Sequence, residues 1–354
     1  MDHVVVMAGG SGTRFWPESR VRRSKQFLDL TGRGPMIRET IRRLFPLLRK
    51  ENVWVVACEK DAPHLSPRSL GIPARNILLE PEGKNTAPAV ALAVASIGRS
   101  DPDAVIAAAP ADHAVADERA FRSALGKGLR VARRTGRFVT IGIPPTHPAT
   151  GYGYIERGEP FAAAGKAVFT ARRFTEKPSL AAARRFVNSG RFSWNSGIFL
   201  FRADTFRDRL SRFLPQVHAA MEAAFRSFGR KEFRGKLDAA YRRIPSVSVD
   251  YGILEKEKGI LVLPVEFGWS DLGTWRSLHE FLGKPGENVT FGNVILSDCR
   301  NTLVRSDRGL VAAVGMEDVV VVRSGDAVLV CPRSRSEEVK RIAEEVRSKF
   351  PALA

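Results

Sequence analysis

The sequence contains little cysteine: three residues in 354, at positions 58, 299 and 331, all far apart. A disulfide framework needs cysteines in pairs, and a structural zinc site needs closely spaced ligands such as Cys-x-x-Cys. Neither pattern is present. The cysteine content therefore argues against a small disulfide-stabilised secreted domain and against a zinc site.

Long apolar runs are also lacking. A membrane-spanning helix needs roughly 18 to 20 uninterrupted apolar residues, and no window of the sequence approaches that length. The amino terminus passes into the strand-like run Val4-Val5-Val6 without the pattern of a signal peptide. We therefore expect a cytoplasmic protein that does not interact with membranes.

Acidic residues are the minority among the charged ones. The chain has 38 Asp and Glu residues and 56 Lys and Arg residues, which gives a formal net charge of +18. Such a charge attracts nucleic acid, anionic membrane surfaces or polyanionic small substrates. Many arginines occur as pairs on helix-like stretches, and no basic run alternates with aromatic residues as in a nucleic-acid platform. We interpret most of them as solvated helix faces and expect no nucleic-acid partner.

Length and periodicity indicate two parts. Up to about residue 283, short apolar strands alternate with helical patterns, which predicts an α/β domain with a mixed, mostly parallel sheet. Residues 284–354 show short β runs followed by an amphipathic helix at 336–349, which predicts a β-roll or β-helix appendage. The β runs are 290–296, 302–305, 310–314, 319–323 and 327–331.

A glycine-rich loop, Gly9-Gly10-Ser11-Gly12-Thr13-Arg14, follows the first strand. Three glycines in four positions let backbone amides approach an anion, and Arg14 can grip two phosphate oxygens. A tight strand-to-loop turn is the alternative. Phe15 replaces the third glycine of a dinucleotide fingerprint, and no Gly-Lys-Ser/Thr ending of a Walker A loop follows. The loop therefore predicts a phosphate cradle of another kind, with Lys25 as a second cation or as a surface lysine.

Polar residues follow the strand at 76–79. Glu80, Asn85 and Thr86 lie between this strand and the next helix, where ligands bind in open α/β sheets. Thr86 alternatively caps the helix. Asn85 has no such explanation, and its amide suits the edge of a nucleobase.

Two aspartates are candidate magnesium ligands. Asp112 follows the apolar strand at 104–109, and Asp271 follows the strand at 260–265. Mg²⁺ prefers one or two carboxylates together with substrate phosphates. The alternative for Asp271 is to cap the helix that begins near Thr274.

The candidate sugar-phosphate residues come later in the chain. The pair Glu176-Lys177 can hold a sugar hydroxyl and a phosphate, or can form a simple surface ion pair. Asn195 offers an amide at the start of a buried strand, and Asp250 is a helix cap or a ligand. Gly153 lies in an alternation of glycine and aromatic residues that suits close approach of a ligand or an edge strand.

The motifs together resemble the bacterial mannose-1-phosphate guanylyltransferases over residues 1 to about 283, and less distinctly to about 331. The resemblance implies a GT-A-like nucleotidyltransferase fold and the reaction of GTP with mannose 1-phosphate to give GDP-mannose and pyrophosphate. The matching stretches are 9–17, 25–27, 80–88, 110–113, 151–155, 174–178, 194–201, 249–256 and 268–275.

The resemblance also implies a role for each candidate residue. Lys25 would contact the α-phosphate, Asn85 the guanosine, and Asp112 with Asp271 would bind Mg²⁺. The nucleotide set is completed by Ala8, Gly9, Gly10, Gly12, Thr13, Glu80 and Thr86, and Arg14 would also hold the triphosphate. The catalytic set is Arg14, Lys25, Asp112 and Asp271. The sugar-phosphate set is Gly153, Glu176, Lys177, Asn195 and Asp250.

The sequence departs from the family pattern at three positions. Glu18 replaces a leucine, Ser24 a proline and Ala111 a serine. The first two affect the rigidity of the loop that places Lys25. The chain stops before the isomerase domain that some relatives carry, so isomerase activity is not expected.

The expected chemistry fits the residue inventory, because a sugar phosphate is already anionic and can attack the α-phosphorus in line without a general base. Two alternatives remain open. One is the same fold with another base or sugar, and the other is a catalytically idle regulatory or nucleic-acid-binding homologue. We also expect a homodimer formed through the C-terminal domain.

Overall fold

The computed structural model describes residues 1–10, 12–165 and 167–353. Contacts divide the chain into two compact units, each built from several segments. The first unit comprises Met1–Gly9, Ile41–Ala111 and Val115–Trp269, and the second comprises Gly10–Thr40, Asp112–Ala114 and Ser270–Ala354. The division of the sequence into domains 1–283 and 284–354 stays a prediction. Ser11, part of the glycine-rich loop, lies outside the described residues.

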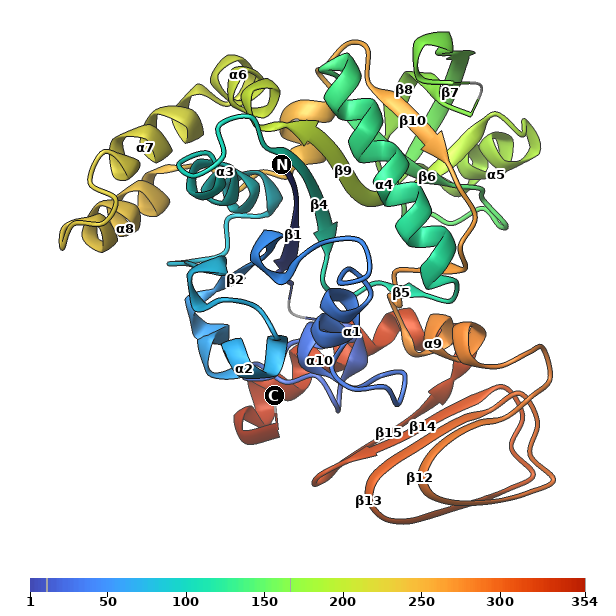
Figure 1. The fold of residues 1–354 in the computed structure, drawn as a ribbon. Coiled ribbons are helices and arrows are strands. Elements are labelled where there is room, and N and C mark those ends of the chain that lie inside the picture. The colour runs from blue at the N-terminus through green and yellow to red at the C-terminus, as the bar shows by residue number, and fades with distance from the viewer. Residues whose placement is uncertain (11, 166, 354) are drawn as a thin grey trace. The chain divides into compact units, whose positions relative to one another are not determined.

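The first unit is built on a nine-stranded sheet (Figure 1). Strand β9 is antiparallel to β4 and β6, and β8 is antiparallel to β10 and β7, whereas the remaining pairings between neighbours are parallel. Seven of the nine described strands therefore run in one direction, and the predicted mixed, mostly parallel sheet is confirmed. In spatial order the strands are β3 (Ile77–Glu80), β2 (Val53–Cys58), β1 (Asp2–Ala8), β4 (Val105–Pro110), β9 (Phe192–Arg202), β6 (Val139–Ile143), β10 (Leu261–Pro264), β8 (Phe169–Thr175) and β7 (Tyr154–Pro160).

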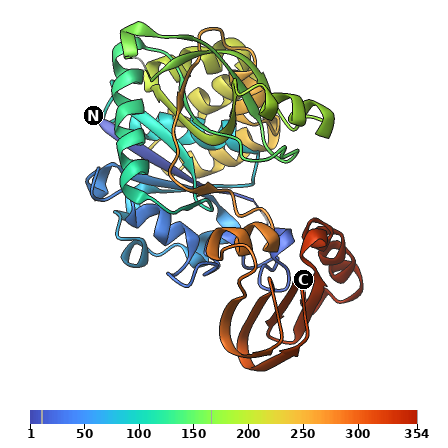
Figure 2. The same ribbon diagram turned by 90° about the vertical axis from the view of Figure 1, so that its right-hand side faces the viewer.

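Helices cover both faces of this sheet (Figure 2). Successive side chains of a strand point to opposite faces. Phe199 and Phe201 of β9 belong to the core formed with α3, α6, α7 and α8, whereas Leu200 faces Gly128 of α4. The helices of this unit are α2 (Pro67–Leu70), α3 (Thr86–Ile97), α4 (Glu118–Thr135), α5 (Leu180–Asn188), α6 (Ala203–Phe213), α7 (Pro215–Phe225) and α8 (Phe233–Arg243).

Helices α3 and α4 differ in how much of their surface is buried, and their sequences explain the difference. Helix α3 consists mostly of alanine and valine and is buried along nearly its whole length, because it packs against both the sheet and α6 and α7. Helix α4 is amphipathic, with Asp117 as its N-cap and Gly136 in the left-handed conformation at its end. Helix α3 begins directly after Asn85, one of the polar residues that the sequence placed after the strand at 76–79.

The second unit contains a four-stranded sheet with the order β12-β13-β14-β15. The first two pairings are parallel and the last is antiparallel. The predicted runs 302–305 and 310–314 form one strand, β13, because its pairing with β12 continues across an irregularity between Phe291 and Asn293. The strands are β12 (Val289–Ser297), β13 (Leu303–Val314), β14 (Val319–Ser324) and β15 (Ala327–Pro332).

An apolar core joins the segments of the second unit. Phe15 packs edge-on against Trp275, with ring centroids 4.8 Å apart, and Trp275 donates a hydrogen bond from its indole N–H to the carbonyl of Trp16 at 3.1 Å. Leu303 of β13 and Val339 of α10 belong to the same core. The loop after β1 is thereby fixed against the C-terminal segments. The helices of this unit are α9 (Trp275–Leu282) and α10 (Val339–Lys349).

Three remaining elements each have residues in both units, because a segment boundary falls within them. Helix α1 spans Met36–Arg42, and the short strands β5 (Ala114–Val115) and β11 (Trp269–Ser270) pair with each other. Among the described residues, no helix is both long and apolar enough to cross a membrane.

Candidate functional site

A polar pocket of about 340 Å³ lies within the second unit. Its walls come from separate segments of the chain. These are the glycine-rich loop, the turn at Lys25, the stretch after β4, the stretch before α9 and one residue of α10. The lining residues are Gly12, Thr13, Arg14, Phe15, Lys25, Asp112, His113, Asp271, Gly273 and Lys340. The pocket thus brings together the four residues to which the sequence assigned catalysis.

Lys25 is the buried cation of this pocket, with 7% of its side chain exposed. Its ammonium donates hydrogen bonds to the Asp112 carboxylate at 2.8 Å and to the backbone carbonyl of Asp271 at 2.5 Å. Gly12 makes this arrangement possible, because a Cβ at position 12 would lie 2.3 Å from the Cβ of Lys25. Gly12 also has a φ of +60°, which favours glycine. The glycine is therefore required by the packing of Lys25 on the loop.

The carboxyl group of Asp112 is held in its ionised form. Burial by itself raises the pKa of this group, but the charges of Lys25 and His113 and the hydrogen bond from Lys25 outweigh burial. The pKa of Asp112 consequently lies below its usual value. An ionised carboxylate beside the glycine-rich loop suits a divalent cation.

Asp271 does not cap the following helix. Thr274 takes that position: its hydroxyl accepts a hydrogen bond from the backbone N–H of Ser277, whose own hydroxyl accepts one from the N–H of Thr274. The carboxylate of Asp271 accepts a hydrogen bond from the N–H of Gly273 at 3.0 Å. Thr274, and not Asp271, is therefore the N-cap of this helix.

Within the described residues, no group of three or more His, Cys, Asp or Glu side chains is arranged to hold a metal. Asp112 and Asp271 provide two carboxylates on the wall of one pocket. Mg²⁺ commonly takes one or two protein carboxylates and completes its octahedron with water and substrate phosphates. The donor set is thus of the kind that a nucleotide-bound Mg²⁺ requires.

Arg14 lines the pocket, and its side chain is 45% exposed. Its guanidinium forms an ion pair with Glu337 at 3.1 Å, in the turn that precedes α10. The sequence predicted Arg14 as a phosphate ligand but did not single out Glu337 or Lys340. No motif marks these two residues, since they join the pocket only through the packing of the C-terminal segment.

A second polar cluster lies within the first unit and contains predicted sugar-phosphate residues. Asn195 donates a hydrogen bond from its side-chain amide to the Asp250 carboxylate at 2.8 Å. A Cβ at Gly153 would lie 2.4 Å from a carboxylate oxygen of Glu176 and 3.3 Å from the Cβ of Asn195. Glycine at 153 therefore permits this close packing. Lys177 is mostly exposed, and its ammonium is 3.9 Å from the Glu176 carboxylate.

The acidic groups of this cluster hold protons more tightly than usual. Burial, followed by the charge of Asp250, raises the pKa of Glu176 to about 7, although Lys177 acts in the opposite direction. Burial also raises the pKa of Asp250, against the effect of its hydrogen bond from Asn195. The Glu176 carboxyl group can therefore change its protonation state near neutral pH.

The predicted nucleotide residues Glu80, Asn85 and Thr86 also lie in the first unit. Asn85 is the N-cap of α3, and its side chain accepts a hydrogen bond from the N–H of Thr86 at 2.8 Å. The interpretation of Thr86 as the cap was wrong, because its hydroxyl instead accepts a hydrogen bond from the N–H of Val249 at 2.9 Å. Thr86 thus joins the start of α3 to the segment that carries Asp250.

Glu80 is buried and accepts a hydrogen bond from the hydroxyl of Tyr241 at 3.0 Å. Burial raises the pKa of Glu80 to about 7, and the Tyr241 hydrogen bond reduces that rise. The sequence did not predict this contact, since the two residues are 161 positions apart. Ala8, at the end of β1, is buried, whereas Gly9 and Gly10 are exposed.

Known protein families match nearly the whole chain. The nucleotidyl transferase family matches residues 3–284, and the MannoseP isomerase/GMP-like beta-helix domain matches residues 292–346. The expected nucleotidyltransferase fold with a β-helix-like appendage is thereby confirmed.

Similar proteins share both parts. The mannose-1-phosphate guanylyltransferase ManC of Salmonella typhimurium is 42% identical over 97% of this chain and 73% of its own length. The xanthan biosynthesis protein XanB of Xanthomonas campestris pv. campestris is 40% identical over the same shares. A crystal structure from Thermus thermophilus, described as a mannose-1-phosphate geranyltransferase, has a TM-score of 0.89 and 35% identity, over 98% of this chain and 99% of its own. The chain therefore belongs to the nucleotidyl transferase family and, within it, to the mannose-1-phosphate guanylyltransferases.

Proposed function

We propose that this chain transfers GMP from GTP to α-D-mannose 1-phosphate, giving GDP-mannose and pyrophosphate. The observation that carries the proposal is the buried ammonium of Lys25, which contacts Asp112 and Asp271 beside the glycine-rich loop. A phosphate cradle, a fixed cation and two carboxylates are the groups that nucleotidyl transfer requires. The names of the guanylyltransferase relatives support the choice of guanine nucleotide and mannose.

The reaction needs charge neutralisation and positioning. A phosphate oxygen of mannose 1-phosphate attacks the α-phosphorus of GTP, and the bond between the α-phosphorus and the oxygen bridging to the β-phosphate breaks. Pyrophosphate leaves with the electron pair of that bond. Lys25 and Arg14 would bind the triphosphate and offset the negative charge that grows on the leaving group. Because the attacking oxygen is already anionic, the step requires no general base.

Mg²⁺ is the proposed cofactor, held by Asp112 and Asp271. When bound, it would neutralise charge on the triphosphate and the departing pyrophosphate. Lys25 would keep Asp112 ionised and oriented through their hydrogen bond. Ala8, Gly9, Gly10, Gly12 and Thr13 would form the cradle for the triphosphate.

Recognition of the sugar and of the base also belongs to the proposal. Glu176, Asn195 and Asp250 are held close to one another and can bind sugar hydroxyls, and the exposed ammonium of Lys177 can bind the sugar phosphate. Asn85 would read the guanine, with Thr86 and Glu80 supporting the same loop. Gly153 would let Glu176 and Asn195 pack close to the backbone at this position.

The direct test supplies the purified chain with each of the common nucleoside triphosphates and several sugar 1-phosphates in the presence of Mg²⁺. Products are identified by chromatography with mass spectrometry. We expect GDP-mannose and pyrophosphate in equal amounts, with GTP and mannose 1-phosphate as the preferred pair. Absence of GDP-mannose, or a clear preference for another pair, would contradict the proposed substrates.

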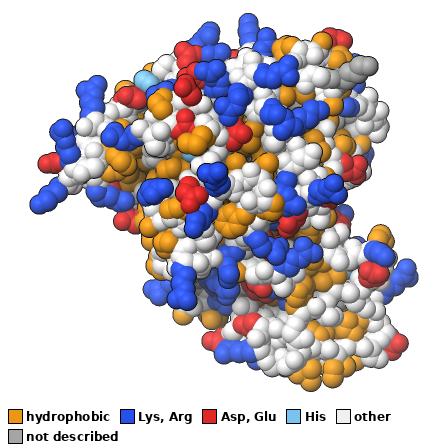
Figure 3. All heavy atoms as spheres, viewed as in Figure 1, with side chains coloured by type: hydrophobic (Ala, Val, Ile, Leu, Met, Phe, Trp, Pro, Cys, Tyr) orange, Lys and Arg blue, Asp and Glu red, His pale blue; other side chains and the backbone are white. Residues whose placement is uncertain are grey.

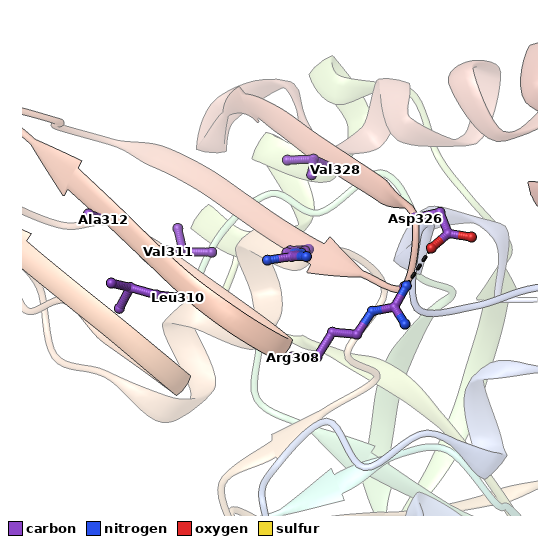
Figure 4. Close-up of a pocket in the computed structure, with 8 residues that line it drawn as sticks. Arg308, Leu310, Val311, Ala312, Asp326 and Val328 are labelled. Carbon is purple, nitrogen blue, oxygen red and sulfur yellow. Dashed lines mark hydrogen bonds and ion pairs between the residues drawn. The ribbon is translucent and has the colours of Figure 1, made fainter.

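The homodimer also belongs to the proposal. Five apolar side chains on the four-stranded sheet are more than half exposed: Ile295, Leu310, Val314, Val328 and Val330. Leu310 and Val328 line a hollow on this sheet together with Arg308 and Asp326, whose ion pair is drawn in Figure 4. A second copy of this sheet would cover these side chains, and Leu310→Asp would then lower the mass measured by sedimentation to that of a monomer.

The cytoplasmic location expected from the sequence stays a prediction, which fractionation of cells producing the chain would test. Figure 3 shows the basic side chains dispersed over one face of the molecule, among acidic and apolar ones. On the face shown, this dispersal fits small polyanionic substrates at a pocket better than an extended nucleic-acid surface.

A further inference from the structure

The C-terminal helix α10 packs against the glycine-rich loop within the second unit. It contacts the short helical turn Thr13–Phe15, which carries Arg14. The residues after α10 add polar contacts, since the backbone carbonyl of Leu353 accepts hydrogen bonds from the Trp16 indole at 3.1 Å and from the Arg20 guanidinium. The C-terminal segment is therefore held against the loop that we assign to the triphosphate.

Lys340 of α10 lines the polar pocket together with Gly12, Thr13 and Arg14. Its ammonium is 3.7 Å from the carboxylate of Glu344, one turn further along the helix, and both side chains are exposed. Such an exposed pair is weak, because water screens the charges and both side chains lose rotamer freedom. A triphosphate in the pocket carries more negative charge than Glu344 and would attract the ammonium more strongly.

Glu337 lies just before α10 and has the opposite charge. Its ion pair with Arg14 engages the guanidinium that the loop would offer to phosphate. Glu337 is 74% exposed, so this pair also costs little to break. A bound triphosphate and Glu337 would compete for the same cation.

We propose that the C-terminal segment belongs to the triphosphate site. In this proposal Lys340 binds the pyrophosphate part of the nucleotide, and Glu337 holds Arg14 until the phosphates displace it. The proposal rests on the assignment of the polar pocket to GTP, and it adds one ligand and one competing anion to that site. Lys340 would then assist pyrophosphate departure as well as nucleotide binding, since the same phosphates develop charge in the reaction.

The test compares Lys340→Gln with Lys349→Gln, a matched control on the same helix. Lys349 is also exposed and also pairs with a glutamate one turn away, Glu345, but it does not line the pocket. Binding of inorganic pyrophosphate with Mg²⁺ is measured by calorimetry, and kcat and KM for GTP are measured separately. We expect Lys340→Gln to weaken pyrophosphate binding roughly 5- to 10-fold and to raise KM for GTP by a similar factor.

Glu337→Gln should act in the opposite direction and strengthen pyrophosphate binding about 2- to 5-fold, because Arg14 loses its competing partner. Lys340→Arg should restore most of the affinity, whereas Lys349→Gln should leave it unchanged. Equal pyrophosphate affinities of Lys340→Gln and the unchanged protein would overturn the role of Lys340. A decrease in affinity with Glu337→Gln would overturn the competition.

The calorimetric result separates this inference from the proposed function. If the unchanged protein makes no GDP-mannose but loses pyrophosphate affinity on Lys340→Gln, the substrates are wrong and the polyphosphate site stands. If it makes GDP-mannose and Lys340→Gln has full activity and affinity, the function stands and the role of α10 is wrong.

Discussion

The ammonium of Lys25 lies 2.8 Å from the carboxylate of Asp112, although 87 residues separate them in the chain. The same ammonium contacts the backbone carbonyl of Asp271. One buried cation therefore connects the turn after the glycine-rich loop with both candidate metal ligands.

Replacing Lys25 by methionine should lower kcat/KM for GDP-mannose formation by roughly 10²- to 10³-fold, the usual effect of removing one preorganised charge-stabilising group. The change also leaves the half-buried Asp112 without its cation, so the free energy of unfolding should fall. Steady-state kinetics and urea denaturation measure the two effects. Activity close to that of the unchanged protein would show that Lys25 does not contact the reacting phosphates.

Asp112→Asn and Asp271→Asn should each raise the Mg²⁺ concentration needed for half-maximal activity and reduce the maximal rate by at least about tenfold. Removing divalent ions with a chelator should abolish turnover, and added Mg²⁺ should restore it. Asp326→Asn is the control, because this exposed carboxylate pairs with Arg308 outside the polar pocket. Unchanged turnover of Asp271→Ala would show that the metal assignment is wrong.

Gly12→Ala should displace the loop from Lys25 and reduce activity by more than about tenfold, since its Cβ would lie 2.3 Å from the Cβ of Lys25. Gly315→Ala is a matched control. Gly315 has a similar φ of +65°, and no atom of the described residues lies within 4 Å of a Cβ built there. It should cost about 1 to 2 kcal/mol of stability from backbone strain and leave the specific activity unchanged. Equal loss of activity in both variants would contradict the packing argument.

The pH dependence should identify Glu176. Its pKa is raised to about 7, so the carboxylate that can accept sugar hydroxyls is lost as the pH falls through 7. KM for mannose 1-phosphate should therefore rise as the pH is lowered across this value, and this rise should be smaller in Glu176→Gln. The substrate phosphate titrates in the same range, but equally for both proteins. Identical pH profiles would remove Glu176 from the sugar site.

Glu80 should make stability depend on pH. Because its folded pKa is raised from 4.5 to about 7, folding favours the protonated form, and its contribution is lost as the pH rises from about 4.5 through 7. The loss amounts to about 3 kcal/mol at roughly 1.4 kcal/mol for each pKa unit. Glu80→Gln should flatten this part of the curve of unfolding free energy against pH. Parallel curves for the two proteins would show that Glu80 is not the titrating group.

Much of the fold follows from local patterns. Strand-like runs, glycine positions and helix starts predicted the mixed sheet, and Thr274 was expected at the start of α9. The exceptions are positions where the local sequence is compatible with two structures. Asn85 caps α3 although Thr86 is also a good capping residue, because the Thr86 hydroxyl is used by Val249 from a distant segment. Similarly, two short β runs merge into β13 because pairing with β12 continues through the irregularity.

By itself, the sequence determined that a glycine-rich loop follows the first strand and that this loop is neither a dinucleotide fingerprint nor a Walker A loop. It also contains the family motifs that indicated guanylyl transfer. These features can be read from the sequence because each depends on the spacing of residues that are close together in the chain. Tertiary structure alone decided that Lys25 meets Asp112, that Asn195 meets Asp250, and that Lys340 reaches the polar pocket. The partners in these contacts lie on segments that come together only when the core packs, and no periodicity along the chain encodes such contacts.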